Sequence, residues 1–162
     1  MTQKTFGFIG LGLIGGSLAK ALKRSNPSCR IMAYSRTSTT TGLALSEHAI
    51  DICCTSVSDP QFAACDCIFL CAPVDTNISA LRILKDIVPP DCILTDVGSV
   101  KTDIHRAAQE MGLNGRFIGG HPMAGSDRIG FINSKAVLLE NAYYILTPTD
   151  SVPENKVTDY KN

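Results

Sequence analysis

The chain has 162 residues, of which 44% are hydrophobic and 19% are charged, a balance typical of a single globular domain with a buried core. Its 15 basic and 15 acidic side chains cancel, which argues against nucleic acid or an anionic membrane as a partner and favours small molecules. Because the amino-terminal residues show no secretory signal pattern and no apolar run is long enough to span a membrane, we expect a cytoplasmic protein.

The amino-terminal third of the chain predicts alternating strands and helices. A strand over residues 5–9 runs into Gly10, and a helix is predicted over 13–23, where Leu18 and Leu22 recur at helical spacing. The next predicted elements are a strand over 30–34, a short helix from about 39 to 47 and a weaker strand over 50–53.

The same alternation continues to the carboxyl-terminal end. Further apolar strands are predicted over 67–71, 92–96 and 116–119, and the helices between them over 75–88 and 101–111. A helix over 132–141 and a strand over 143–146 follow. From Ser151 the composition becomes polar, and Ser151-Val152-Pro153-Glu154 resembles the start of another helix.

The predicted strands are apolar throughout rather than alternating apolar with polar residues. Such strands are buried on both faces of a parallel sheet, and the helices between them supply right-handed crossovers. The fold class predicted is therefore α/β, with a doubly wound, mostly parallel sheet of the Rossmann type.

The seven cysteines form an odd set without C-x-x-C spacing, and most lie in apolar runs. They are Cys29, Cys53, Cys54, Cys65, Cys67, Cys71 and Cys92. This pattern predicts reduced core thiols rather than disulfides. No metal site is expected, because the seven cysteines lack the paired spacing of a metal-binding set.

The strongest binding motif lies between the first predicted strand and helix. Gly10-Leu11-Gly12-Leu13-Ile14-Gly15 matches G-x-G-x-x-G in the context that offers backbone N–H groups and a helix N-terminus to a pyrophosphate. In this interpretation Gly10 makes the tight turn, Gly12 lets phosphates approach the backbone, and Gly15 allows close helix–sheet packing.

The second predicted strand ends in Ser35-Arg36-Thr37, where an NAD-selective site would offer a carboxylate to the ribose. The hydroxyls of Ser35 and Thr37 can hydrogen-bond a 2′-phosphate, and Arg36 can pair with it or stack on the adenosine. NADP is therefore the predicted cofactor, with NAD possible. The alternative is that Arg36 is an ordinary solvated arginine.

Two further strand ends fall at the sheet edge where ligands bind in open α/β folds. In Cys71-Ala72-Pro73-Val74 the proline would bend the chain across the cofactor, or would simply end the strand. In Asp96-Val97-Gly98-Ser99-Val100-Lys101, Gly98 is expected at the cofactor, and Ser99 can contact substrate or steer an imidazole, or act only as a helix N-cap.

His121 is the candidate catalytic base, in the predicted loop Gly119-Gly120-His121-Pro122-Met123-Ala124-Gly125-Ser126. A neutral imidazole can accept a hydroxyl proton near pH 7 while a hydride leaves the same carbon, and the glycines let a ligand come close. A purely structural histidine is the alternative. His48 and His105 are expected at solvated helical positions.

With these motifs assembled, the chain closely resembles the nucleotide-binding domain of the TyrA-type prephenate and arogenate dehydrogenases. The resemblance rests on residues 10–19, 96–101 and 119–126, in the family's order. It implies NAD(P)-dependent oxidative decarboxylation in tyrosine biosynthesis, with His121 on the ring hydroxyl and Ser99 holding the imidazole. Gly125 and Ser126 are then expected at the substrate.

The resemblance also implies a second, helical domain that completes the substrate pocket and forms a homodimer. We accordingly divide the chain into a dinucleotide-binding domain, residues 1–150, and the start of a linker toward that domain, residues 151–162. The 162 residues alone are expected to turn over substrate poorly. Two alternatives stay open: a reductase of the β-hydroxyacid dehydrogenase type, and a non-catalytic NADP-binding module.

Overall fold

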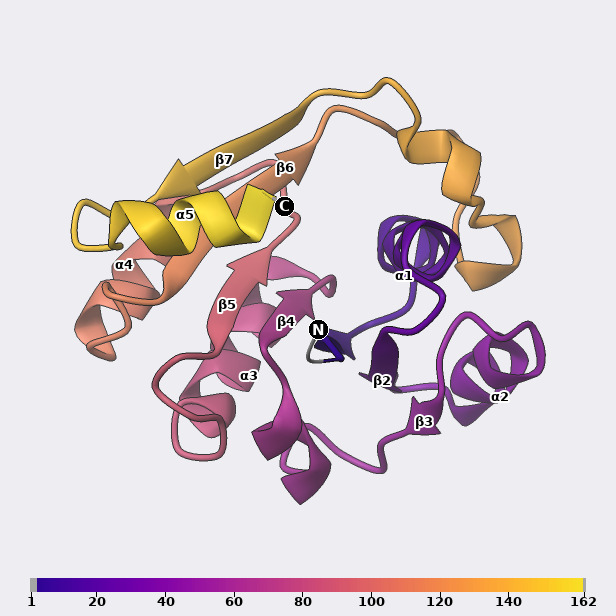
Figure 1. The fold of residues 1–162 in the computed structure, drawn as a ribbon, viewed down its shortest axis with the longest axis horizontal. Coiled ribbons are helices and arrows are strands. Elements are labelled where there is room, and N and C mark those ends of the chain that lie inside the picture. The colour runs from indigo at the N-terminus through magenta and orange to yellow at the C-terminus, as the bar shows by residue number, and fades with distance from the viewer. Residues whose placement is uncertain (1–2, 162) are drawn as a thin grey trace.

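One seven-stranded sheet forms the centre of the protein (Figure 1). The structure is a computed structural model and describes residues 3–161. The strand order is β3-β2-β1-β4-β5-β6-β7, with β7 antiparallel to β6 and every other neighbouring pair parallel. The strands are β1 (Thr5–Ile9), β2 (Arg30–Tyr34), β3 (Ile52–Cys53), β4 (Cys67–Leu70), β5 (Ile93–Asp96), β6 (Phe117–Pro122) and β7 (Tyr144–Pro148). The predicted doubly wound, mostly parallel sheet is confirmed.

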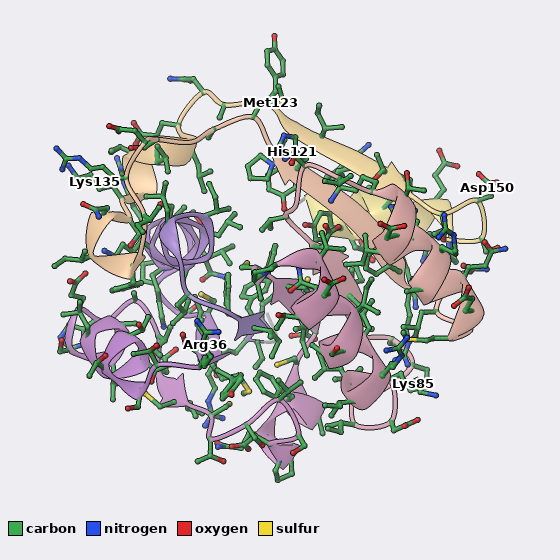
Figure 2. All side chains as sticks on the ribbon, turned by 180° about the vertical axis from the view of Figure 1, so that it is seen from behind. Arg36, Lys85, His121, Met123, Lys135 and Asp150 are labelled. Carbon is green, nitrogen blue, oxygen red and sulfur yellow. The ribbon has the colours of Figure 1, made fainter. Side chains whose placement is uncertain are left out.

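Helices cover both faces of this sheet. The α-helices are α1 (Leu13–Ser25), α2 (Ser38–Ser46), α3 (Val74–Leu84), α4 (Thr102–Glu110) and α5 (Glu154–Lys161). The first, second and fifth pack on one face, and α3 and α4 pack on the other, which is the face seen in Figure 2. In residues 3–161 no helix is long and apolar enough to cross a membrane.

Both faces of the central strands are buried, as their continuous apolar sequences predict. Along β4, Ile68 and Leu70 belong to the cluster under α3 and α4, whereas Phe69 belongs to the cluster under α1, α2 and α5. Neighbouring residues thus point into different cores. Burial of this kind contributes about 1.5–3 kcal/mol for each large apolar side chain.

Two predicted helices differ from the observed ones. The helix over 75–88 ends at Leu84, ahead of the prolines at 89 and 90. The predicted helix over 132–141 is wrong: the segment forms two 3-10 helices, η2 (Phe131–Asn133) and η3 (Ala136–Leu139). Ser134 and Lys135 between them are extended, with ψ of 139° and 137°, which interrupts any helix.

Residues 123–143 leave β6, cross over α1 and return to β7, and we call this segment the arch (Figure 1). Its contact with α1 is close, because a Cβ on Gly16 would lie 2.6 Å from a ring carbon of Phe131. The Ser17 hydroxyl accepts a hydrogen bond from the Lys135 N–H at 3.0 Å. The Lys20 ammonium lies 4.4 Å from the centre of the Phe131 ring. The arch therefore ties β6 to the first helix.

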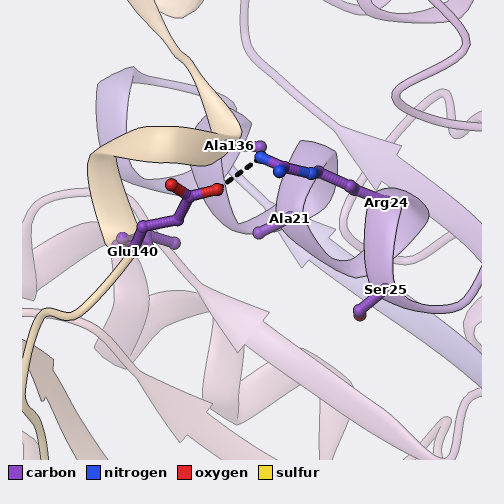
Figure 3. Close-up of a pocket in the computed structure, with 6 residues that line it drawn as sticks. Ala21, Arg24, Ser25, Ala136 and Glu140 are labelled. Atoms are coloured by element: carbon purple, nitrogen blue, oxygen red, sulfur yellow. Dashed lines mark hydrogen bonds and ion pairs between the residues drawn. The ribbon is translucent and has the colours of Figure 1, made fainter.

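A shallow hollow of about 360 Å³ lies between α1 and η3 (Figure 3). Arg24 and Glu140 form an exposed ion pair of 2.5 Å at this hollow. A second hollow of about 490 Å³ lies between α1 and α5. Neither is lined by any of the predicted site residues, which lie at the carboxyl ends of the strands instead.

Candidate functional site at the carboxyl edge of the sheet

The glycine-rich turn joins β1 to α1 in the geometry that the motif predicts. Gly10 has φ +92°, and a Cβ there would lie 3.1 Å from the backbone of Ala72. Gly12 is the N-cap of α1, and a Cβ at this position would meet no atom within 4 Å. A Cβ on Gly15 would lie 2.6 Å from the Gly10 carbonyl oxygen. The turn is thus tightly packed on one side and open at Gly12.

The open side of this turn suits an anion. No side chain caps the α1 N-terminus, and its first turn contains no acidic residue. The positive end of the helix dipole is therefore met by no capping side chain and by no carboxylate of the first turn. The turn also lies at the switch point of the sheet, since β1 pairs with β2 on one side and β4 on the other. Ligands bind at such switch points in doubly wound folds.

The segment 71–74 lies beside this turn, where the N–H of Cys71 donates to the carbonyl of Ile9 at 2.8 Å. Pro73 is the N-cap of α3. The fully buried side chain of Asn77 fixes the bend: its Oδ1 accepts from Ala72 N–H at 3.1 Å, and its Nδ2 donates to the Ala72 carbonyl at 2.8 Å. Our sequence analysis missed Asn77, although a polar residue on the apolar face of a helix was a usable signal.

The residues predicted to select the cofactor follow β2, next to the glycine turn. The carbonyl of Tyr34 accepts from the Gly10 N–H at 2.8 Å, which joins the two strand ends. Ser35 is half-buried, and Arg36 and Thr37 are exposed. Among residues 3–161 no side-chain hydrogen bond engages Arg36, so its guanidinium is available to a ligand. In Figure 2 Arg36 lies below the end-on helix α1 and His121 lies above it.

The loop after β5 is organised by Asp96, whose side chain is fully buried. Its Oδ2 accepts hydrogen bonds from the Lys101 ammonium at 2.5 Å and from the Gly98 N–H at 3.1 Å. Ser99 is exposed at the tip of this loop. It is not the N-cap of α4, because that position falls at Lys101 and no side chain caps the helix.

His121 lies on β6 rather than in the loop that we predicted, because β7 pairs with the strand as far as Pro122. His121 is opposite Ile145 on β7. Its ring atom Nδ1 is buried without a hydrogen-bond partner in the described part of the chain, whereas Nε2 is not among the buried unpartnered atoms. The glycine turn follows β1, Ser99 follows β5 and His121 lies near the end of β6, so all three share the carboxyl edge of the parallel strands.

The two glycines before His121 permit its close packing. A Cβ on Gly119 would collide with His105 and Thr147, and one on Gly120 would lie 2.8 Å from the ring of Tyr144. Larger residues at either position would therefore force β6 away from its neighbours.

The two expected substrate residues lie on the arch beyond His121. Gly125 is exposed with nothing within 4 Å of a Cβ position. The Ser126 hydroxyl donates to Asp127 at 3.1 Å and accepts from the Arg128 N–H at 3.0 Å. Among the described residues, neither side of these hydrogen bonds involves Ser99 or the glycine turn.

The expectation that His105 is solvated is wrong. It is half-buried, its ring meets Phe117 edge-on at 5.3 Å between centroids, and its Nε2 lies 3.3 Å from the Thr147 hydroxyl. Burial lowers the pKa of His105, with the nearby Lys101 charge acting in the same direction against the charge of Asp96. His48 is exposed at the end of α2, as predicted.

The seven cysteine thiols are all free, and five are buried. Cys65 and Cys67 belong to the cores on opposite faces of the sheet, because Cys65 precedes β4 and only Cys67 lies on that strand. Burial raises the pKa of the Cys54 and Cys92 thiols to about 12. Among residues 3–161 no group of histidine, cysteine and acidic side chains is arranged to hold a metal ion.

The chain is 36% identical to prephenate dehydrogenase of Bacillus subtilis over 156 residues, which cover 94% of this chain and 42% of that protein. Prephenate dehydrogenase from A. aeolicus, solved with hydroxyphenyl propionate and NAD+, superposes with a TM-score of 0.91 at 31% identity, covering 99% of this chain and 56% of that one. Synechocystis arogenate dehydrogenase superposes with a TM-score of 0.88 at 34% identity, covering 97% and 54%.

The chain thus spans about half the length of these relatives. The family profile described as prephenate dehydrogenase, nucleotide-binding domain, matches residues 18–162. This match extends through the loop after β5, the His121 strand and the arch. The chain belongs to the prephenate dehydrogenase family and comprises its nucleotide-binding domain.

Proposed function

We propose that the turn at residues 10–15 binds the pyrophosphate of a nicotinamide dinucleotide. The support is the open Cβ position of Gly12 at an uncapped helix N-terminus, and the NAD+ complex of the A. aeolicus relative. The adenosine would extend toward Arg36 after β2, and the nicotinamide toward β5 and β6. Four interstrand spacings, roughly 19 Å, separate β2 from β6, a span that suits an extended dinucleotide.

Our second proposal is a preference for NADP over NAD, on the strength of Arg36. Its exposed guanidinium follows β2 with no carboxylate in Ser35-Arg36-Thr37 to repel a 2′-phosphate. Arg36→Ala should weaken NADP+ binding about tenfold or more, equivalent to about 1.4 kcal/mol, and leave NAD+ binding unchanged. Calorimetric titration of both cofactors measures this, with Arg128→Ala as a matched exposed-arginine control. Tighter binding of NAD+ than of NADP+ by the parent chain would refute the preference.

For the whole protein that carries this domain, we propose oxidative decarboxylation of prephenate or arogenate, a step of tyrosine biosynthesis. The bound dinucleotide supplies a hydride acceptor. The C–H bond at the hydroxyl-bearing ring carbon breaks with both electrons leaving as hydride, and the hydroxyl proton passes to Nε2 of His121. The bond to the carboxylate at the opposite carbon then breaks, CO₂ leaves, and its electron pair makes the ring aromatic. His121 returns the proton to the phenolic oxygen.

The observation that carries this proposal is the position of His121 at the edge shared with Ser99 and the glycine turn. The test uses the longest reading frame that contains these residues, with prephenate and arogenate and with both cofactors. His121→Gln and Ser99→Ala should each lower kcat by about 100-fold or more, with the dinucleotide Kd unchanged. Turnover within a few-fold of the parent would refute both roles.

The alternative function is a non-catalytic dinucleotide-binding module, and the chain spans about half the length of each relative. In our proposal the 162 residues bind NADP but turn over substrate poorly, and the remaining half completes the pocket and the homodimer. The two functions differ in the longer protein. Only the enzyme shows turnover that depends on His121.

A further inference from the structure

Two buried side-chain atoms lack a hydrogen-bond partner among residues 3–161, namely Oδ1 of Asp96 and Nδ1 of His121. Nearly all buried polar atoms in proteins are hydrogen-bonded, so each such atom calls for a physical explanation. Oδ1 of Asp96 is a carboxylate oxygen that accepts a hydrogen bond, and Nδ1 of His121 is an imidazole nitrogen that can donate one. They also lie on adjacent strands, β5 and β6. The two unpartnered atoms are therefore chemically complementary.

Strand register places both side chains on one face of the sheet. Asp96 is in register with Gly119, and His121 is two residues further along β6. The Asp96 carboxylate points toward α4, since its Oδ2 contacts Lys101, and a Cβ on Gly119 would point the same way, 3.2 Å from the Lys101 side chain. Because side chains alternate along a strand, His121 points to the face that Gly119 faces.

The separation between the two residues suits one hydrogen bond or one bridging water. The parallel strands β5 and β6 lie roughly 4.8 Å apart and two residues along a strand span roughly 6.6 Å, so the two Cβ atoms are about 8 Å apart. Oδ1 of Asp96 and Nδ1 of His121 are each two bonds from their Cβ, which brings both atoms up to about 2.5 Å closer. The direct hydrogen bond is not formed in the structure, but a rotation of the imidazole or one water closes the gap.

We propose that Asp96 is the positioning residue of His121: the Nδ1–H group of His121 donates to Oδ1 of Asp96, directly or through one water. This arrangement fixes the neutral tautomer that carries its lone pair on Nε2, the form a proton acceptor requires. Asp96 is itself held in place, because its other oxygen accepts from Lys101 and from the Gly98 N–H. One carboxylate thus orients His121 and shapes the loop that presents Ser99.

The inference deepens the proposed role of His121 and rests on it for its catalytic meaning, but its first test needs no turnover. In this 162-residue chain, ¹⁵N NMR of the imidazole at alkaline pH reports the tautomer. The parent should show Nδ1–H as the major form of His121. Asp96→Asn combined with Lys101→Met removes the buried ion pair without leaving one charge unpaired, and Nε2–H should then become the major form.

Lys101→Met alone is the matched control, because it removes the cation and keeps the Asp96 carboxylate. It should retain the Nδ1–H form, and circular dichroism verifies that each variant is folded. A parent that is mainly Nε2–H, or a double variant with the parent's tautomer, would overturn the proposal. If Asp96→Asn alone fails to fold, the double variant still decides the question.

Turnover in the longer protein then separates this inference from the proposed function. The double variant should lower kcat without changing the dinucleotide Kd, and it should cause no further loss in a His121→Gln background. If the losses of kcat from the double variant and from His121→Gln are additive in this mutant cycle, the positioning role is overturned. A fully active His121→Gln variant would instead overturn the proposed function, while the tautomer measured by NMR would still hold.

Discussion

Replacing Gly12 with alanine should weaken dinucleotide binding without unfolding the protein, and replacing Gly15 should destabilise the fold itself. The backbone at Gly12, with φ −83° and ψ −156°, accepts any L-residue, and its Cβ would meet no protein atom. A methyl group there would occupy space that the phosphates need. We expect a stability loss of no more than about 1 kcal/mol, because only an N-cap preference changes, and a loss of at least about tenfold in NADH affinity.

Alanine at Gly15 meets rigid neighbours instead of open space. Its Cβ would lie 2.6 Å from the carbonyl oxygen of Gly10 and 2.9 Å from the Cβ of Cys71, neither of which is the end of a flexible side chain. Overpacking of this kind costs about 1–3 kcal/mol, and the better helix propensity of alanine returns up to about 1 kcal/mol. With a return of about 1 kcal/mol the net loss is about 0–2 kcal/mol, which corresponds to a fall in Tm of up to roughly 8 °C at this chain length.

Gly42 in α2 provides the control, because it too has an open Cβ position. Gly42→Ala should raise Tm by roughly 2–4 °C through helix propensity alone and leave NADH binding unchanged. Thermal denaturation and NADH fluorescence titration measure the three variants side by side. If Gly12→Ala binds NADH as the parent does, the turn is not the pyrophosphate site. If Gly15→Ala is as stable as Gly42→Ala, the close-packing argument is wrong.

Three further predictions concern stability and reactivity. Burial raises the pKa of the Cys54 and Cys92 thiols to about 12, so both should resist a disulfide reagent at about pH 8 until denaturant is added. Rapid labelling of these thiols in the folded protein would contradict their burial. Burial lowers the pKa of His105 below its ordinary 6.5, so the unfolded chain binds this proton more readily than the folded chain. The stability that is present above pH 6.5 is therefore lost as the pH falls through the folded pKa. His105→Gln should flatten this decline in the free energy of unfolding, measured with urea from about pH 7 to 5. Arg24→Ala breaks the exposed ion pair with Glu140 and should lower the free energy of unfolding by no more than about 1 kcal/mol, measured with urea. A loss above about 2 kcal/mol would show that this ion pair anchors the arch to α1.

The alternating strands and helices could be predicted because the core on each face imposes a repeating pattern on the sequence. β4 is apolar at every position since Ile68 and Phe69 belong to different cores. The turn between β1 and α1 could also be predicted, because each glycine of the G-x-G-x-x-G motif is required by a different steric constraint at its position. These features depend on local sequence and on one rule of sheet burial.

The features that could not be predicted depend on contacts between distant segments. The segment 132–141 has helical spacing, but the Lys135 N–H bonds to Ser17 on α1, more than 100 residues earlier, and the helix is interrupted there. His105 lies on a helix that reads as solvated, yet β7 brings Thr147 against its ring. The pairing of β7 with β6 also converts the expected loop around His121 into strand. None of these partners is visible from the local sequence.

The contact between the arch and α1 has a consequence for how the protein is made. The first βαβ unit is complete once residue 34 has left the ribosome, but the face of α1 that carries Gly16 stays uncovered until Phe131 and Ser134 emerge. While the intervening residues are being synthesised, this face of α1 is not covered by the arch. Nascent chains arrested before the arch should therefore require chaperone protection that chains extending past residue 140 do not.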